Sequence, residues 1–155
     1  MDVHAFASPG EGRRLVLGGV EIPSDRGLLG YSDADVLAHA ITDALLGAAG
    51  LEDIGHYFPD DDERYRDADS IELLRRVREL VGGWWRVANV DAVVVCERPK
   101  IRDYRQKMRE NLARALGVEP EQVGVRGTTS EGLGFTGRGE GIAAQAVCLL
   151  EEDTG

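Results

Sequence analysis

The sequence SDADVLAHAITDALLGAAG, from Ser32 to Gly50, decides the fold because its apolar residues recur at helical spacing. Ser32 is a suitable N-cap, and the aspartates that follow it favour the positive end of a helix dipole. Gly50 is a suitable C-cap. We therefore predict a helix from Ser32 to about Ala49, with one side available for a core. The apolar residues at helical spacing are Val36, Leu37, Ala40, Ile41, Ala44 and Leu45.

Shorter patterns flank this helix on both sides. Arg13–Leu17 and Val20–Ile22 surround a Gly-Gly pair, as in a β-hairpin. Start and stop signals predict two more helices, one from Asp69 or Ser70 to Leu80 and one over Arg102–Leu116. Segments rich in β-branched residues predict strands over Val87–Glu97, Gln122–Thr129 and Gly141–Glu151.

The remaining segments are an acidic loop, Glu52–Ala68, and a glycine-rich turn after Thr129. The order of elements is hairpin, helix, helix, strand, helix, strand, strand. We therefore expect one α/β (α+β) domain over residues 1–155, with helices packed on one face of a mixed β-sheet and a small β-hairpin added. The other face of the sheet then needs a cover, which a symmetric oligomer can supply.

The composition restricts the classes of function. The net charge is −10, so the surface repels phosphate backbones and we expect no nucleic-acid partner. No apolar run approaches the roughly 20 residues of a membrane span. No signal-peptide pattern opens the chain, so we expect a cytoplasmic protein. Cys96 and Cys148 lie in strand patterns and are predicted to be buried, reduced thiols rather than a disulfide or part of a zinc cluster.

One group of residues is typical of a metal site. Asp2 and His4 are two residues apart, so in an extended segment their side chains point to the same side. His39 lies within the predicted helix, and three protein ligands leave a fourth position open, as in catalytic zinc sites. Asp35 or Asp43, one turn away on either side, is expected to accept from the second nitrogen of His39. The alternative is that His39 is an ordinary polar residue of the helix surface.

A second group is typical of phosphate binding. Thr128 and Thr129 end a strand beside glycines, where hydroxyls and backbone N–H groups can donate to an anion. Glu131 can hold a divalent ion between two phosphates, and Lys100 can pair with a phosphate. The alternatives are a flexible turn and a solvated lysine. Asp60 and its acidic neighbours are, by themselves, most simply read as solvated charges.

Together these segments resemble the 2-C-methyl-D-erythritol 2,4-cyclodiphosphate synthase family over nearly the whole chain. The order and the intervals of the motifs agree, and several short motifs in register are far more specific than any one of them. The matching motifs are Asp2-Val3-His4-Ala5-Phe6, Ser32-Asp33-Ala34-Asp35-Val36 with His39, Thr42-Asp43-Ala44-Leu45-Leu46-Gly47, Asp53-Ile54-Gly55, Phe58-Pro59-Asp60, Arg98-Pro99-Lys100, Thr128-Thr129-Ser130-Glu131 and Gly134-Phe135-Thr136-Gly137-Arg138-Gly139-Glu140-Gly141.

The resemblance implies a reaction. The family converts 4-diphosphocytidyl-2-C-methyl-D-erythritol 2-phosphate into the cyclic diphosphate and releases CMP, as a phosphorus–oxygen lyase of the non-mevalonate isoprenoid route. The 2-phosphate of the substrate attacks the β-phosphorus, so the protein only positions the substrate and neutralises its phosphates. The resemblance also implies a homotrimer with active sites at subunit interfaces and a central cavity that takes an isoprenoid diphosphate.

Roles for individual residues follow from the same resemblance. It implies zinc at Asp2, His4 and His39, a second ion (Mg²⁺ or Mn²⁺) at Glu131, and Thr129 as the transition-state donor. The residues implied in ligand binding are Asp53, Gly55 and Asp60 at the erythritol phosphate, Thr128 at a phosphate, Ser32 and Asp62 elsewhere in the substrate site, Pro99, Lys100, Ile101 and Arg102 at the cytidine end, and Phe135 and Arg138 at the central cavity.

Two features depart from the family. Its usual histidine before Ser32 is Tyr31 here, and a tyrosine can donate one hydrogen bond but stays neutral at physiological pH. We therefore expect activity that is reduced but not lost. The family also has a few residues, with glycines, before the Asp-x-His motif, whereas Met1 directly precedes Asp2 here. A shortened first strand is expected to weaken metal binding.

Two other functions compete with this one. The first is a non-catalytic trimer that binds a nucleotide or an isoprenoid diphosphate, with Tyr31 as a mark of lost catalysis; the intact metal-ligand and phosphate residues speak against it. The second is a metal-dependent phosphohydrolase on a similar scaffold, which the lack of an evident water-activating base disfavours. The products separate the three: a cyclic diphosphate with CMP, nothing, or inorganic phosphate.

Overall fold

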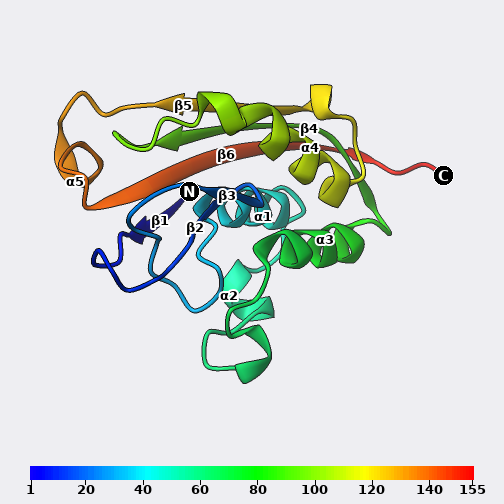
Figure 1. Cartoon of the computed structure of the whole chain (residues 1–155). Helices are drawn as coiled ribbons and strands as arrows, with labels where there is room; N and C mark the ends of the chain where they lie inside the picture. Colours follow the sequence, from blue (N-terminus) through cyan, green and yellow to red (C-terminus); the bar gives the residue numbers. More distant parts are fainter.

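The computed structural model describes residues 1–155. Its main sheet has four strands in the order β1-β6-β4-β5 (Figure 1). The strands are β1 (Asp2–Ala5), β6 (Gly141–Glu152), β4 (Trp85–Val95) and β5 (Val123–Thr128). β4 and β5 are parallel, whereas β6 runs antiparallel to both β1 and β4. The predicted mixed sheet is therefore confirmed.

Three long helices pack on one face of the sheet. They are α1 (Val36–Ala48), α3 (Ser70–Val81) and α4 (Arg105–Leu116). α1 contacts β6 and β4, α4 contacts β5, and α3 packs against both of the other helices. Beside them lies the two-stranded hairpin of β2 (Leu15–Leu17) and β3 (Val20–Ile22). The expected fold class, with helices on one face and a small hairpin, is confirmed.

The first long helix begins later than the sequence predicted. Asp35, not Ser32, is the N-cap of α1, and its side chain accepts a hydrogen bond from the Ala38 N–H at 3.0 Å. The same carboxylate accepts from the two N–H groups of the hairpin turn Gly18–Gly19, at 2.9 and 2.8 Å. One buried side chain therefore starts α1 and also holds the hairpin against it. The predicted end is confirmed, since Gly50 has a φ of 71° just after the helix.

Two predicted irregular segments contain short helices. Asp53 and Asp62 in the acidic loop cap such turns, because their carboxylates accept from backbone N–H groups a few residues later. The helix predicted from Arg102 also starts as a tighter 3-10 turn. These short elements are α2 (Ile54–Tyr57), α5 (Gly134–Gly137) and 3-10 turns at Glu63–Tyr65, Arg102–Tyr104 and Pro120–Gln122.

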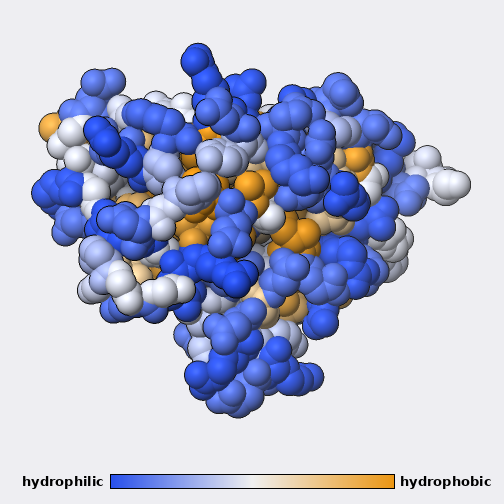
Figure 2. All heavy atoms as spheres, in the orientation of Figure 1, coloured by the Kyte–Doolittle hydropathy of each residue, from blue (hydrophilic) through white to orange (hydrophobic).

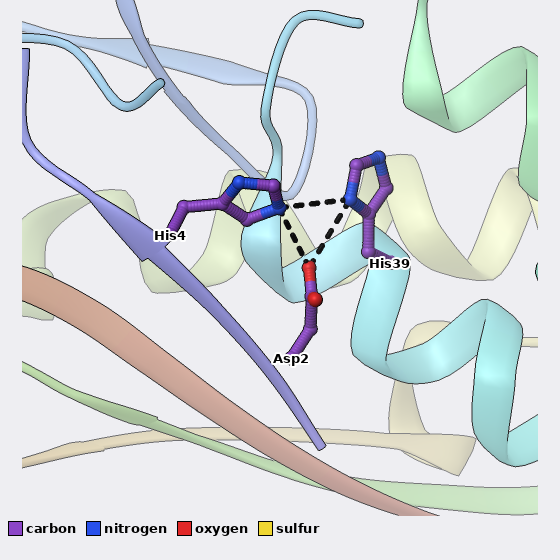
Figure 3. Close-up of side chains that lie close together, drawn as sticks. All are labelled: Asp2, His4 and His39. Atoms are coloured by element: carbon purple, nitrogen blue, oxygen red, sulfur yellow. Dashed lines mark hydrogen bonds and ion pairs between the residues drawn. The ribbon is translucent and has the colours of Figure 1, made fainter. Parts of the chain in front are cut away.

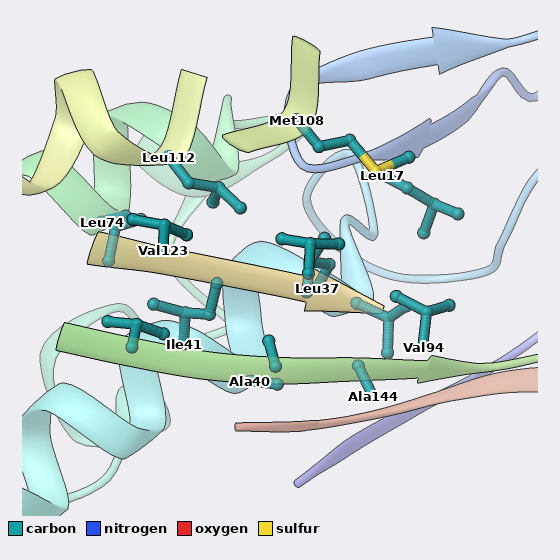
Figure 4. Close-up of a cluster of buried hydrophobic side chains, with 14 of the residues drawn as sticks. Leu17, Leu37, Ala40, Ile41, Leu74, Val94, Met108, Leu112, Val123 and Ala144 are labelled. Atoms are coloured by element: carbon teal, nitrogen blue, oxygen red, sulfur yellow. The ribbon is translucent and has the colours of Figure 1, made fainter. Parts of the chain in front are cut away.

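The hydrophobic core lies between the helices and one face of the sheet (Figure 4). Alternate residues of β4 point into it: Val90, Ala92 and Val94 are buried, whereas Asp91 is exposed and pairs with Arg126 of β5. Truncation of a buried leucine in such a core costs about 2–5 kcal/mol, so packing fixes where α1 sits on the sheet. The helix side chains labelled in the figure are Leu37, Ala40, Ile41, Leu74, Met108 and Leu112.

The opposite face of the sheet is apolar in part and carries no helix. Val3, Val147 and Leu149 are 41%, 66% and 57% exposed. They alternate along β1 and β6 with residues that face the core, such as Ile142 and Ala144. The uncovered face expected from the sequence is therefore present in the single chain.

The rest of the surface is polar. Seen from the side drawn in Figure 1, hydrophilic residues cover most of the molecule and apolar residues show mainly near its centre (Figure 2), in keeping with a net charge of −10. None of the helices combines the length and the apolar character needed to cross a bilayer. Cys96 and Cys148 are free thiols, as predicted, but only Cys96 is buried and Cys148 is half-buried.

Candidate functional site

Asp2, His4 and His39, here called the metal triad, come together in one cluster (Figure 3). The Asp2 Oδ2 atom lies 2.8 Å from His4 Nε2 and 3.1 Å from His39 Nδ1, and the two nitrogens are 3.2 Å apart. Ligand atoms at about 2.0–2.1 Å from a tetrahedral zinc ion stand about 3.4 Å from one another. Small outward shifts therefore adapt these three atoms to such an ion, and the donor set fits it.

A strand and a helix position the triad. β1 directs Asp2 and His4 to the same side because alternate residues of a strand share a face. The register places Asp2 beside Ala144, a buried residue of β6 on the helix-covered face. His39 comes from the first turn of α1, which packs over β6. The spacing of two between Asp2 and His4 thus has the consequence that the sequence predicted.

The loop before α1 supports the His4 ring. The His4 Nδ1 atom lies 2.7 Å from the Leu29 carbonyl oxygen, so a protonated Nδ1 donates there and Nε2 is directed into the cluster. The Leu29 N–H in turn donates to the Ala5 carbonyl at 2.8 Å. A Cβ at Gly30 would come within 2.9 Å of the Ala34 Cβ and 3.2 Å of the His4 ring. Glycine at this position therefore lets the loop pass close to the His4 ring.

The partner of the second His39 nitrogen differs from the prediction. Asp35 is used by backbone N–H groups at the helix start, and Asp43 makes no hydrogen bond to His39. The Nε2 atom instead lies 2.7 Å from Ser70 Oγ and 3.2 Å from Ser32 Oγ. Sequence reasoning missed Ser70 because 31 residues separate it from His39 and no periodic pattern connects them.

Asp2 and His4 stabilise each other's charged forms. Burial raises the pKa of this carboxyl, but hydrogen bonds from His39 and His4 outweigh it and hold the pKa well below its usual range. Burial lowers the pKa of His4, yet its contact with the Asp2 carboxylate raises that pKa overall. An ionised carboxylate beside two imidazoles is a ligand set that suits a borderline divalent metal such as zinc.

A separate cavity of about 300 Å³, here called the strand-end cavity, opens at the carboxyl ends of the parallel strands β4 and β5. Ligands of α/β proteins commonly bind at such ends. Three cationic side chains line it, and one of them, Arg105, was not predicted; its spacing of three from Arg102 is the signal that could have shown it. The lining residues are Cys96, Pro99, Lys100, Ile101, Arg102, Arg105, Gly127, Thr128 and Thr129.

The loop after β5 presents Glu131 to solvent. Glu131 has a φ of 54°, a left-handed conformation that is uncommon for a residue with a side chain. Its N–H donates to Thr129 Oγ1 at 3.3 Å, and the Gly132 N–H donates to Glu97 Oε1 at 3.2 Å. Glu97 therefore ties this loop to the end of β4. Strained backbone that aims an exposed carboxylate is typical of a functional loop.

Phe135 and Arg138 lie a few residues further along, in and just after α5. The Phe135 side chain is 40% exposed, and Arg138 is exposed and pairs only with Glu140, at 2.7 Å. Neither residue contributes to the metal triad or to the strand-end cavity. Both side chains are thus free to meet another molecule.

The acidic loop holds the remaining predicted carboxylates. Asp53 accepts from the His56 N–H at 3.0 Å, and Asp62 pairs with Arg64 at 2.6 Å. Gly55 lies within α2, and Asp60 is exposed without a hydrogen-bond partner. Two of these carboxylates therefore shape the loop, and Asp60 is the one left free for a ligand.

Tyr31 and Ser32 flank the triad from the loop before α1. Ser32 is buried against His39, whereas Tyr31 is half-buried and the Arg66 guanidinium lies 5.4 Å from its ring centroid. The Asp67 N–H donates to the Tyr31 carbonyl at 2.9 Å, so this loop is paired with the segment before α3. The departure from the family motif thus directly precedes Ser32, which contacts His39 of the triad.

The triad and the strand-end cavity are separate within one chain. No triad residue lines the cavity, and β6 and β4 lie between β1 and β5. Asp2 and His4 face the helices. Thr128 belongs to the uncovered face, because it lies two residues after exposed Arg126 and so points to the side opposite buried Val125. The metal triad and the residues predicted at the cytidine end therefore lie apart in a single chain.

Comparison with known proteins identifies the family. Residues 1–151 of this chain match the YgbB family. The chain belongs to the YgbB family. A curated relative from Rubrobacter xylanophilus, named 2-C-methyl-D-erythritol 2,4-cyclodiphosphate synthase, is 79% identical over 155 residues, which are 100% of this chain and 94% of the relative.

Solved structures agree with the YgbB-family assignment. The bifunctional IspDF from Campylobacter jejuni superposes with a TM-score of 0.91 at 43% identity, covering 98% of this chain and 41% of that longer one. The CDP complex of IspF from Plasmodium falciparum gives a TM-score of 0.84 at 34% identity, over 99% of this chain and 93% of that chain. The resemblance drawn from the motifs is therefore confirmed in both sequence and fold.

Proposed function

We propose that this chain converts 4-diphosphocytidyl-2-C-methyl-D-erythritol 2-phosphate into 2-C-methyl-D-erythritol 2,4-cyclodiphosphate and CMP. It acts as a phosphorus–oxygen lyase in the cytoplasm, on the non-mevalonate route to isoprenoid precursors. The observation that carries the proposal is the metal triad in a chain 79% identical to a relative named as this synthase. The cationic strand-end cavity supports it, because a nucleotide diphosphate needs such charges in an otherwise acidic protein.

The reaction needs no protein nucleophile. An oxygen of the 2-phosphate bonds to the β-phosphorus, and the bond from that phosphorus to the oxygen bridging to the α-phosphate breaks. CMP leaves with the bridging oxygen. Asp2, His4 and His39 would hold a zinc ion and Glu131 would hold a Mg²⁺ or Mn²⁺ ion, and these ions would supply Lewis-acid neutralisation of the crowded phosphates. The chain's own part is to fold the substrate so that the attacking oxygen lies in line with the bond that breaks.

The residues divide between the two ends of the substrate. Lys100 and Arg102 offer positive charge and donors at the cytidine diphosphate end, with Pro99 and Ile101 beside them in the strand-end cavity. Thr129 donates to the transferring phosphate in the transition state. The other substrate contacts are Thr128 at a phosphate, Asp53, Gly55 and Asp60 around the erythritol phosphate, and Ser32 and Asp62 elsewhere in the substrate site.

A homotrimer completes the site. The metal triad and the strand-end cavity are separate in one chain, so one substrate spans both if a second copy brings its cavity to the first copy's triad. The uncovered apolar face, with Val3, Val147 and Leu149, offers the surface for this association. Phe135 and Arg138 then face a central cavity that takes an isoprenoid diphosphate. Sedimentation velocity tests the oligomeric state, and a monomer at assay concentrations would contradict this arrangement.

Tyr31 reduces the rate without abolishing it. A neutral phenol can donate a hydrogen bond to the transferring phosphate but adds no positive charge. We expect Tyr31→His to raise turnover, while Tyr31→Phe lowers it by removing the remaining donor. Steady-state rates of CMP release on the three proteins check this expectation. Equal turnover in the tyrosine and histidine forms would show that charge at this position does not matter.

Product analysis tests the proposed function as a whole. The purified protein is incubated with the substrate, zinc and Mg²⁺, and products are followed by phosphorus NMR with and without a chelator. Chelator-sensitive formation of CMP and a cyclic diphosphate is expected. Inorganic phosphate would point to a phosphohydrolase. No turnover by folded, metal-loaded protein would favour a non-catalytic binding protein with an impaired site at Tyr31.

A further inference from the structure

Of the two histidines in the metal triad, His39 is the one whose second nitrogen meets side chains rather than a backbone carbonyl. Its Nε2 atom lies 2.7 Å from the Ser70 hydroxyl, which makes a short hydrogen bond to the Asp33 carboxylate. Ser70 is fully buried. Asp33 also accepts from the N–H groups of Ser70 and Asp35, at 3.1 Å each. A continuous chain of hydrogen bonds thus stands behind this metal ligand.

With a metal on His39 Nδ1, the protons of that chain can be arranged in one way. A carboxylate only accepts hydrogen bonds, so the single hydroxyl proton of Ser70 goes to Asp33. Ser70 then has only lone pairs left for His39, and the proton of a neutral His39 ring must sit on Nε2 to be shared with them. A proton on Nδ1, which the Asp2 carboxylate can accept at 3.1 Å in the absence of a metal, would occupy the metal position. With the Ser70 proton on Asp33, it would also leave two lone pairs facing each other at 2.7 Å.

We propose that Ser70 and Asp33 are positioning residues that hold His39 in the tautomer with its proton on Nε2 and its Nδ1 lone pair free for the metal. This inference rests on the metal role in the proposed function and extends it to the two residues that orient the ligand. Metal-bound histidines commonly donate their other N–H to a carboxylate. Here a buried hydroxyl is inserted between the ring and the carboxylate, and Ser32 Oγ, at 3.2 Å from Nε2, provides a second acceptor.

The same contacts join two helices at the triad. Ser70 is the first residue of α3, and His39 lies in the first turn of α1. The loops before these helices are paired, because the Asp33 N–H donates to the Ala68 carbonyl at 3.1 Å. The hydroxyl is therefore fixed by the backbone of α3 and by a short side chain, and its position relative to the imidazole is well defined.

The tautomer can be read directly. Protein labelled with ¹⁵N-histidine is loaded with zinc and studied in mildly alkaline buffer by long-range ¹H–¹⁵N NMR, and a His56→Gln variant removes the third histidine from the spectrum. For wild type we expect a protonated Nε2 and a zinc-bound Nδ1 at His39. Asp33→Asn can donate from its amide to Ser70, which frees the hydroxyl proton for His39 Nε2. We therefore expect this variant to weaken zinc binding, because a proton on Nδ1 then competes with the metal.

Metal affinity gives the second measurement. Zinc dissociation constants are obtained by competition with a chromophoric chelator, and Ser70→Ala is expected to weaken binding by roughly 10–100-fold. The matched control is Asp69→Ala, which removes the cap of the same helix, a 2.9 Å bond to the Ile71 N–H, without touching His39. The control is expected to lower the thermal unfolding midpoint and leave the zinc affinity unchanged.

Three results would overturn the inference. The first is a zinc-loaded wild type with His39 protonated on Nδ1. The second is a Ser70→Ala variant with wild-type tautomer and zinc affinity. The third is an equal loss of zinc affinity in Asp69→Ala, which would indicate general loosening of the helix. Zinc binding without formation of a cyclic diphosphate would contradict the proposed function and leave this inference standing. A folded wild type that binds no zinc would contradict both.

Discussion

The side chains of the metal triad are held by contacts within the chain, whereas those of the strand-end cavity and the loop after it largely face solvent. Asp2, His4 and His39 bond to one another, and each imidazole has a partner for its second nitrogen. Glu131 and Lys100, in contrast, have no side-chain partner of opposite charge within 4.0 Å. One site is thus preorganised by a single chain, and the other is left open for a ligand.

This difference fits the ligands proposed for the two sites. A small metal ion demands donors fixed to a few tenths of an ångström, so hydrogen bonds behind the ligands improve affinity. A flexible diphosphate bridging two regions is better met by exposed cations and backbone donors that adjust on binding. Variants can therefore separate the two sites, because damage to one should leave the binding by the other largely intact.

The largest effect is expected from removal of a triad ligand. His39→Ala should weaken zinc binding by more than about 100-fold, since loss of a ligand exceeds loss of a partner behind it. Formation of the cyclic diphosphate should fall at least as far, while CDP binding persists. His56→Ala, at an exposed histidine of α2, is the control. Chelator competition and calorimetry measure the two affinities, and a variant that keeps full zinc affinity would show that the triad is not the metal site.

A large effect on stability is expected from removal of Asp35, the N-cap of the helix that carries His39. Asp35→Ala leaves three backbone N–H groups, those of Gly18, Gly19 and Ala38, without their acceptor. Buried unpaired donors cost about 1–3 kcal/mol each, so the free energy of unfolding should fall by roughly 3 kcal/mol or more. Urea unfolding measures it, with Asp43→Ala on the same helix as control. A loss no greater than that of the control would mean that water replaces the carboxylate.

A moderate effect is expected in the strand-end cavity. Lys100→Met should weaken CDP binding in the presence of Mg²⁺ by roughly 10–100-fold, because hydrogen bonds to charged groups contribute about 1.5–3 kcal/mol. Lys107→Met is a matched control, since Lys107 is the other lysine of the chain and lies on the exposed side of α4, 3.9 Å from Glu110. Calorimetry compares the two variants. Equal affinities would place the nucleotide elsewhere, and zinc binding should be unchanged in both.

The smallest effect is expected in the alkylation rates of the two thiols. Burial raises the pKa of both Cys96 and Cys148 to about 11, so little thiolate forms at neutral pH and alkylation should be slow for both. The rate should rise as the pH approaches 11. Cys96 lines the strand-end cavity and Cys148 does not, so CDP should slow the reaction at Cys96 alone. Peptide mass mapping after timed alkylation checks this, and equal protection of both thiols would argue against a nucleotide in the cavity.

Local patterns predicted most of the elements. The hairpin around Gly18-Gly19, the helix from Ser70 and the three long strands all lie close to their predicted bounds, because spacing, caps and β-branched residues act over a few neighbours. The errors arise where a side chain bonds to a distant segment. Ser32 looked like a cap, but Asp35 takes that role because it also satisfies the hairpin turn.

The sequence by itself determined the fold class, the family and the three residues of the metal triad, because these depend on periodicity and on motifs read in order along the chain. Only the tertiary structure decided what stands behind the triad and how the predicted site residues are grouped. Ser70 meets His39 across 31 residues, and Asp33 meets Ser70 across 37. Such contacts are set by how α1 and α3 pack on the sheet, and no local pattern records which side chains that packing brings within hydrogen-bond distance.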